Sequence, residues 1–564
     1  MTSLKISLSL RVNRVTARFC GRILALASIA TLSSISSVGA QVVETHTFDP
    51  IYPPVAQDAP DPYLSPAMVP SPAVPPSSSG SAVKKSVTNV LKNFGAFGGL
   101  TVPPLFPNAL PRRVIGPAPY DPVFPSTEFL GPTIGSPDTD GAYPLERALY
   151  KACPLLRRQR IKIYGWGNPG CGWSTSHHSN IPNSYFITPN SLQLDQLILR
   201  IERTPDTAQN EHNDWGFRYT SLYGIDYRWT TAQGWGPASQ ELLKHNALYG
   251  YDPVELYGQF YMPKVAKGML VKVGRYISPP DIEAQLAPDN YLWTHSQMFT
   301  FDAYTHTGIN AAIKLNKQWT VQAGIHAGSD MAPWAAGAIP TGELYLKYDA
   351  KNNKDSFYGG IDAINSGRFR LGKRTIQAQN DVNNVNTAFA NLGSPLQIAN
   401  PKIAAHDNLQ QFNFTWSHAF SRRVHTATEA YLLYSIDALQ GGTVVNGPSR
   451  SFNANVGPGR LLPHTSMAWG VVNYTNIKVT DHDFISIRPI DFLGDPRGWR
   501  TGFPATLASW TIGWTHRFSD TLSIRPEIRY DRSLSRYHGA VVRPYDNGTK
   551  IYQLTMGFDL IQRF

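Results

Sequence analysis

Cysteine, long apolar runs and clustered basic residues are all scarce in this chain. Each of these absences excludes some classes of protein. The 564 residues include three cysteines. No segment beyond residue 40 holds roughly eighteen consecutive apolar residues, so the sequence offers no transmembrane helix. No Lys/Arg-rich run and no nucleic-acid-binding module is present, which argues against nucleic acid as a partner.

Residues 1–40 have the features of a secretory signal peptide. Five basic residues and no acidic one precede an apolar run over 23–32, and Val38-Gly39-Ala40 offers a small-residue cleavage site. Cys20 lies before the apolar run, so it does not fit a lipid-acceptor cysteine. Removal of this segment takes five positive charges from the net charge of +11 and leaves about +6 on the exported chain.

An exported chain with neither an apolar helix nor a lipid anchor can enter a membrane only as a closed barrel. The reason is that every backbone polar group in hydrocarbon needs a partner within the protein. The remaining thiols are Cys153 and Cys171. An oxidising periplasm permits them to pair, but the predicted first strand lies between or beside them and would hold them apart.

Proline crowds residues 41–143, as in Pro70-Ser71-Pro72 and Pro75-Pro76. Proline at this density prevents helices and β-ladders, which predicts a disordered, low-complexity extension in the periplasm. Three roles stay open for it: a tether to the cell wall, a spacer, or a plug of a barrel lumen. A helix expected over 145–156 then leads into a single barrel domain over 144–564.

From about Arg160 onward the sequence alternates with the period of a β-strand, and we predict sixteen strands. Between 214 and 229 the odd positions are mostly aromatic or apolar, from Tyr552 to Leu560 every second residue is apolar, and the chain ends on Phe564. A hydrophobic content of 42%, an aromatic content of 12% and a mean hydropathy of −0.26 fit a wall that meets lipid on one face only.

The connections between these strands alternate in length. Short turns are expected at 316–317, 351–354, 421–422, 481 and 519–520, and long loops near 231–251, 277–304, 365–407, 438–467 and 533–549. Such alternation is typical of barrels with periplasmic turns and extracellular loops. The sequence therefore predicts an all-β fold, a transmembrane antiparallel β-barrel with both termini in the periplasm.

Several segments then carry a family resemblance. They are Ile163-Tyr164-Gly165-Trp166, Leu222-Tyr223-Gly224-Ile225-Asp226-Tyr227-Arg228, Lys272-Val273-Gly274-Arg275-Tyr276 and Thr305-His306-Thr307-Gly308. In this order they resemble the OmpL-like putative beta-barrel porin family, from roughly residue 160 to the end. The resemblance implies a bacterial outer-membrane barrel with porin activity and no defined substrate. The terminal Phe564 resembles the signature that the barrel-assembly machinery reads.

A barrel of this size encloses a water-filled lumen, and the residues opposite the apolar sets should line it. The predicted lining residues are Arg218, Asp226, Arg228, Glu255, Lys272, Lys314, Lys347, Asp349, Arg423, Glu429, Arg525, Glu527, Arg529 and Asp531. By analogy with general porins, the loop 277–304 could fold inward and form a constriction with Asp281, Glu283, Asp289 and His295. An outward-lying loop is the open alternative.

The leading functional hypothesis is passive diffusion of small hydrophilic solutes or ions through a barrel in outer-membrane lipid. Whether the barrel forms a homo-oligomer is open. The alternative is a structural or adhesive barrel whose long loops plug the lumen. A third reading is an outer-membrane lipid hydrolase, because His177-His178-Ser179-Asn180 is similar to the catalytic segment of outer-membrane phospholipase A. Ile181 replaces the glycine expected there, so we assign no catalytic, cofactor-binding or metal-ligating residue.

Overall fold

The computed structural model describes residues 134–135 and 143–564, with gaps at 366–409 and 442–460 and at 233, 236–241, 244, 246, 280–281, 336–337, 339, 352–353, 422, 520 and 538. The predicted signal peptide and almost all of the proline-rich extension therefore lie outside the described residues. None of the helices in the described part of the chain is long and apolar enough to span a membrane.

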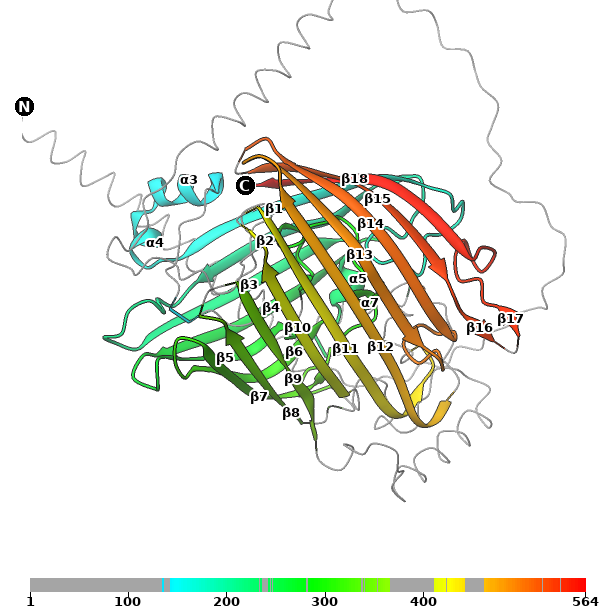
Figure 1. Ribbon diagram of the computed structural model, residues 1–564. Helices are drawn as coiled ribbons and strands as arrows, with labels where there is room; N and C mark the ends of the chain where they lie inside the picture. The colour runs from blue at the N-terminus through cyan, green and yellow to red at the C-terminus, as the bar shows by residue number, and fades with distance from the viewer. Residues whose placement is uncertain are drawn as a thin grey trace, which may run out of the picture. The chain divides into compact units, whose positions relative to one another are not determined.

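Among the described residues, sixteen strands form one closed antiparallel barrel in which each strand pairs with its neighbour in the chain (Figure 1). The strands are β1 (Lys162–Ser174), β2 (Ser191–Arg203), β3 (Asp214–Gly224), β4 (Gly250–Met262), β5 (Met269–Ile277), β6 (Thr305–Lys314), β7 (Trp319–Ser329), β8 (Thr341–Asp349), β9 (Asp355–Asn365), β10 (Gln410–Ala419), β11 (Val424–Leu439), β12 (Leu461–Lys478), β13 (Asp483–Asp495), β14 (Ala505–Arg517), β15 (Leu522–Ser533) and β18 (Tyr552–Arg563).

Smaller elements sit at the ends of the barrel or within its loops. The hairpin β16 (Arg536–Tyr537) and β17 (Ala540–Val541) extends the connection that leads to β18. Helices α3 (Pro144–Ala152) and α4 (Pro154–Arg158) precede β1, while α5 (Tyr227–Thr230), η1 (Ala287–Asp289) and α7 (Gln297–Thr300) lie in loops. The helix expected over 145–156 is thus present as α3 followed by the start of α4.

The barrel closes where its first strand meets its last. Trp166 of β1 stands opposite Arg563 of β18, and the backbone N–H of Phe564 donates to the carbonyl of Gly165 at 2.9 Å. A Cβ on Gly165 would lie 2.7 Å from the Phe564 ring, so the glycine leaves room for the terminal aromatic side chain. The alternating pattern at the C-terminus is therefore the closing strand, as the sequence predicted.

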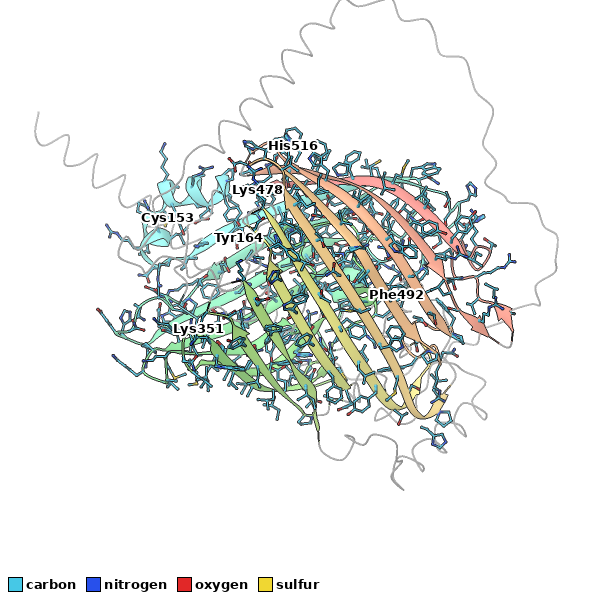
Figure 2. The ribbon with its side chains drawn as sticks, in the orientation of Figure 1. Cys153, Tyr164, Lys351, Lys478, Phe492 and His516 are labelled. Atoms are coloured by element: carbon cyan, nitrogen blue, oxygen red, sulfur yellow. The ribbon has the colours of Figure 1, made fainter. Side chains whose placement is uncertain are left out.

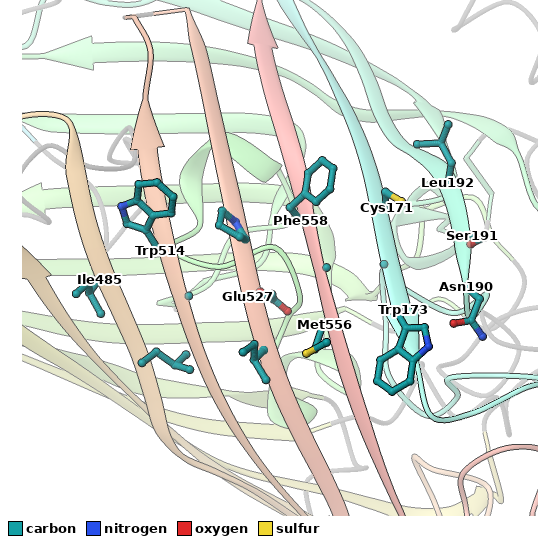
Figure 3. A pocket seen from close by; sticks show the side chains of 16 residues that line it. Cys171, Trp173, Asn190, Ser191, Leu192, Ile485, Trp514, Glu527, Met556 and Phe558 are labelled. Carbon is teal, nitrogen blue, oxygen red and sulfur yellow. The ribbon is translucent and has the colours of Figure 1, made fainter.

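The outer face of the strands is apolar. Trp173, Trp514, Ile528 and Met556 are all among the exposed large side chains of β1, β14, β15 and β18. They border a shallow apolar hollow of about 880 Å³ on the outside of the wall (Figure 3). Cys171 lines the hollow as a free thiol, so it is not paired with Cys153.

The two ends of the barrel differ in the length of their connections. Turns at 315–318, 350–354, 420–423, 479–482 and 518–521 are short, whereas 225–249, 278–304 and 534–551 at the other end are long. The predicted alternation is confirmed for these connections, and the long loops expected at 365–407 and 438–467 fall mainly outside the described residues. Lys351, Lys478 and His516 mark the short-turn end (Figure 2), and the described chain both enters and leaves the barrel there.

One strand ends earlier than the alternation predicts. The expected strand over 214–229 stops at Gly224, and α5 begins three residues later. Gly224 has φ +147°, and a Cβ there would lie 2.1 Å from the carbonyl oxygen of Asp195. The close approach turns the chain away from the wall, so the prediction that Asp226 and Arg228 lie on this strand is wrong.

Candidate functional site

The loop 278–304 between β5 and β6, here called the inward loop, crosses the inside of the barrel. Its helix α7 contacts β12, β13 and β14, which lie on the opposite part of the ring from β5 and β6. Figure 1 shows α7 behind the strands of that wall. Trp293 extends the reach to the first strands, because its indole N–H donates to Asp195 of β2 at 2.7 Å.

Apolar side chains account for much of this inward folding. Tyr291, Leu292, Met298 and Phe299 of the loop are buried in one cluster with residues of the inner wall. Leaving such side chains in water outside the barrel would cost about 1.5–3 kcal/mol each. The apolar face of this loop is therefore covered by the interior of the barrel.

Glycines in the wall make room for these side chains. A Cβ on Gly513 would lie 2.4 Å from Leu292, one on Gly557 would lie 2.5 Å from Trp293, and one on Gly470 would lie 2.3 Å from Met298. All three glycines lie on barrel strands remote in sequence from the loop. The wall is thus shaped to receive the inward loop.

A carboxylate of the wall fixes the centre of the loop. Glu527 accepts hydrogen bonds from the backbone N–H of Trp293 at 2.9 Å and of Thr294 at 3.1 Å, and it also accepts one from the Thr294 hydroxyl. All three residues are buried. Charge-assisted hydrogen bonds of this kind are stronger than neutral ones, so Glu527 is an anchor of the loop.

Three arginines of the wall hold carbonyl groups of the same loop. Arg525 donates to the carbonyl of Asn290 at 2.7 Å, Arg488 to that of Thr294 at 2.8 Å, and Arg529 to that of His295. These guanidinium groups are buried, and Arg525 and Arg529 are also paired with the carboxylates of Asp559 and Asp531. Part of the charge on this side of the wall is therefore used to hold the loop.

A second segment, residues 175–190 between β1 and β2, joins the inward loop. Tyr185 stacks on His295 with ring centroids 3.8 Å apart and on Trp229 of α5 at 4.9 Å. Asn183 donates to Asp531 of β15 at 2.7 Å. Aromatic and polar contacts thus join two long loops and α5 into one assembly inside the barrel.

His295 is an uncharged member of this assembly. Burial lowers its pKa to about 3, and the positive charges of Arg488, Arg525 and Arg529 act in the same direction. Its Nε2 lies 2.8 Å from the carbonyl oxygen of Ala284. At neutral pH the imidazole is therefore neutral and adds no positive charge to the interior.

Strands β2, β3 and β4 carry a balanced set of charges on the inner wall. Arg218 pairs with Glu202 at 2.8 Å and with Glu255 at 3.3 Å, while Arg200 pairs with Glu255 at 2.9 Å. Arg218 and Glu255 were expected on the inner face, whereas sequence reasoning missed Arg200 and Glu202. Their strand, β2, alternates poorly in sequence, and so does β13, which carries the missed Arg488.

The other predicted lining residues have varied surroundings. Lys347 and Asp349 are buried on β8, and Glu429 accepts from the backbone N–H of Ile282 in the inward loop at 2.7 Å. Lys272 lies 5.1 Å from the centre of the Tyr257 ring, and Lys314 donates to the carbonyl of Ile134 at 2.8 Å.

Asp226 accepts from Gln196 at 2.7 Å and Arg228 donates to the carbonyl of Ala247 at 2.7 Å. Arg423 is exposed in the turn directly before β11, outside the barrel strands.

The four residues predicted for a constriction are placed as follows. Asp281 lies outside the described residues. Glu283 is buried and accepts from the Tyr474 hydroxyl of β12 at 2.7 Å, His295 is buried as described above, and Asp289 is half-buried at the end of η1. The loop that carries them lies inside the barrel, which decides between the two predicted orientations of the loop; that these residues narrow a channel stays a prediction.

The segment similar to a lipid hydrolase lies in the loop after β1. The Ser179 hydroxyl accepts from the backbone N–H of Ile181 at 3.1 Å, while Nδ1 of His178 lies 3.1 Å from Asp546. The segment belongs to no strand, whereas the chemistry of that family requires a lipid-facing strand. Its geometry therefore adds nothing to the hydrolase reading.

A closed antiparallel barrel with an apolar outer face and a polar interior crossed by a loop defines the class of outer-membrane channel proteins. The model of the family described as "Putative beta-barrel porin-2, OmpL-like" matches residues 160–564. The chain belongs to this family. It is a porin of the outer membrane, and the predicted family, fold class and channel function are confirmed.

Solved structures of outer-membrane channels are similar to the barrel. The anion-selective porin from Comamonas acidovorans has a TM-score of 0.42 at 9% identity, over 72% of this chain and 99% of that one. The outer membrane channel DcaP of Acinetobacter baumannii has a TM-score of 0.41 at 8% identity, over 72% and 97%. OmpT of Vibrio cholerae has a TM-score of 0.38 at 8% identity, over 72% of this chain and 97% of that one. The comparison with curated proteins gives no match.

Proposed function

We propose that the inward loop sets the bore of this porin, so that small hydrophilic solutes or ions pass beside it. The observation that supports this is the pair of hydrogen bonds from the backbone of Trp293 and Thr294 to Glu527 on the far wall. A loop held at both sides of the lumen reduces the cross-section open to water and brings charged groups near the path. Pore diameter and lining charge are the properties that set selectivity.

A plugged structural or adhesive barrel is the second candidate, and one observation favours it. The inward loop, the segment 175–190 and α5 share a buried apolar cluster with the wall, which includes Tyr185, Trp229, Leu292 and Phe299. Water and ions do not cross such a cluster, so a route must pass beside it. A barrel without such a route would conduct little.

We also propose that the short-turn end of the barrel faces the periplasm. The described chain enters and leaves the barrel at that end, and short periplasmic turns are usual in such barrels. The signal segment 1–40 would be removed, the extension 41–143 would lie in the periplasm, and the assembly machinery would read Phe564, which directly follows β18. Lipid would cover the apolar outer face, and self-association would take place across the same face.

Recordings in a planar lipid bilayer separate the two candidate functions. The folded exported chain is compared with a variant that lacks residues 41–143. Stepwise ohmic openings in both support a diffusion channel, and the reversal potential in a salt gradient gives its ion preference. Openings in the truncated form alone would make the extension a plug, while silence from folded protein in both forms would favour the structural barrel.

A further inference from the structure

Two histidines and two carboxylates meet on the inner wall at the long-loop end of four adjacent strands. They are His306 of β6, His326 of β7, Glu343 of β8 and Asp362 of β9, and all four side chains are buried. The ladders place Glu343 directly opposite Asp362 and His326 opposite Gly308, two residues from His306. The four positions lie on four consecutive strands, and the pairing of these strands brings the side chains together.

The four side chains lie within contact of one another. The two imidazole rings are parallel within 5°, with centroids 3.8 Å apart. Asp362 lies 2.7 Å from Nε2 of His326 and 3.2 Å from Nε2 of His306, while Glu343 lies 3.4 Å from Nδ1 of His306. One nitrogen of each histidine and one oxygen of Glu343 all lie within 4.8 Å of one another.

Several of these buried atoms make no hydrogen bond within the described part of the chain. They are both ring nitrogens of His306 and Oε2 of Glu343. His306 is fully enclosed, so bulk water does not satisfy them. Among the described residues, the same atoms are held only by the ion-pair contacts at 3.2 and 3.4 Å, which lack hydrogen-bond geometry. Buried polar atoms in native proteins are nearly always hydrogen-bonded, so these converging donor atoms are suited to hold a bound ion.

The wall is modified locally around the cluster. The β6–β7 ladder shifts register between His306 and Gly308, and the β8–β9 ladder shifts between Gly342 and Glu343. Such bulges re-aim side chains and often occur beside functional sites. Gly324 adds space, because a Cβ there would lie 2.5 Å from Oε1 of Glu343.

We propose that this cluster is a binding site for a divalent transition-metal ion, with Zn²⁺ as the best-matched ion. His306, His326 and Glu343 would be its ligands, and Asp362 would complete or orient the set. Imidazole and carboxylate ligands are the donors that Zn²⁺ takes in proteins. One divalent ion also balances the charges of the two buried carboxylates while both imidazoles remain neutral.

Small movements of these side chains suffice to bind a zinc ion. Donor atoms about 2 Å from a tetrahedral ion are separated by roughly 3–3.5 Å, close to the distances within the cluster. Asn310 donates to the other oxygen of Glu343, a contact of the kind that orients metal ligands. Gly328 donates to Nδ1 of His326 at 3.1 Å, and this bond must be given up when Nε2 binds the ion, because the ring proton then moves to Nδ1.

The test uses the full untagged exported chain, refolded with ZnCl₂ because the cluster is buried, and then freed of loosely bound metal by gel filtration. We expect one Zn²⁺ per chain, and X-ray absorption at the zinc edge should show two imidazole ligands. The variants His306→Gln and Glu343→Gln should each lose at least nine-tenths of the bound zinc. His516→Gln, which alters an isolated histidine–carboxylate pair with Asp483, is the matched control and should retain it.

The proposal fails if the folded wild-type chain retains no zinc, or if His306→Gln binds as much zinc as the wild type. It also fails if His516→Gln loses zinc to the same extent as the two cluster variants. Should a cluster variant not fold, as judged by its mobility on unheated gels, the wild-type absorption spectrum decides the question. A spectrum without imidazole scattering overturns the proposal on its own.

Discussion

At the scale of single residues, the interior is built around contacts that join positions far apart in the chain. Glu527 was predicted to face inward because its strand alternates, and it does so. Its hydrogen bonds to Trp293 and Thr294 span more than two hundred positions, and no periodicity predicts them. The inner-wall cluster of His306, His326, Glu343 and Asp362 was missed for the same reason, because it forms only when four strands align.

The fit between Gly513 and Leu292 gives a residue-scale prediction. Gly513→Ala should destabilise the folded barrel by about 1–3 kcal/mol, because the added methyl group overlaps Leu292. Leu292→Ala should cost about 2–5 kcal/mol by leaving a cavity. The double variant should lose less than the sum, since the alanine methyl group fills part of that cavity. Denaturant unfolding of all four proteins measures the coupling, and strict additivity would contradict the contact.

His295 gives a prediction about pH. In the unfolded chain its pKa is near the ordinary value of about 6.5, and in the folded chain burial lowers it to about 3. The unfolded state therefore binds one more proton between these values. The contribution of neutral His295 to the free energy of unfolding is complete above about pH 6.5. It is lost at up to about 1.4 kcal/mol per pH unit as the pH falls toward 3.

His295→Gln should reduce the number of protons taken up on unfolding by about one, and so weaken the pH dependence of the free energy of unfolding. Unfolding free energies of the variant and the wild type are measured in detergent from pH 7 to pH 4. A wild-type slope that the substitution leaves unchanged would show that His295 is not the buried neutral group described here.

At the scale of elements, the period of two predicted the strands and their turns well, because lipid on one side and polar groups on the other require it. The prediction fails at the end of β3, where Gly224 lets the chain leave the wall. It gave no answer for the inward loop, since nothing local distinguishes a loop that folds into a barrel from one that lies outside. The apolar residues 291–293 and 298–299 indicate that this loop needs a buried environment. The wall glycines that receive them lie on distant strands, so the sequence does not show where the loop packs.

Protease sensitivity tests the placement of the inward loop. Proteinase K added to the folded barrel should cut the exposed connection around β16 and β17 before it cuts residues 282–304, because the latter are enclosed. Glu527→Ala should release the loop and make it cleavable, since two backbone N–H groups lose their acceptor. Glu211→Ala, at an exposed acidic residue of the β2–β3 turn, is the control and should leave the cutting order unchanged. Early cleavage of residues 282–304 in the wild type would contradict their enclosure.

At the scale of the whole molecule, an apolar outer face, a closed ring of strands and an occupied interior belong together. Closure leaves no strand edge in lipid, and the width of the ring leaves a space that side chains of the wall alone do not fill. The inward loop occupies part of that space and is held by Glu527 and three arginines. The central claim is that this loop sets the bore of an otherwise wide channel.

Single-channel conductance in a planar bilayer tests that claim most directly. The wild type is compared with a variant in which residues 283–300 are replaced by a short Gly–Ser linker, and with a control that lacks the exposed hairpin 536–541. We expect discrete ohmic openings from the wild type, openings roughly twofold larger or more from the loop variant because the lumen is wider, and wild-type openings from the control. Equal conductance of the wild type and the loop variant, with both shown to be folded, would contradict the account.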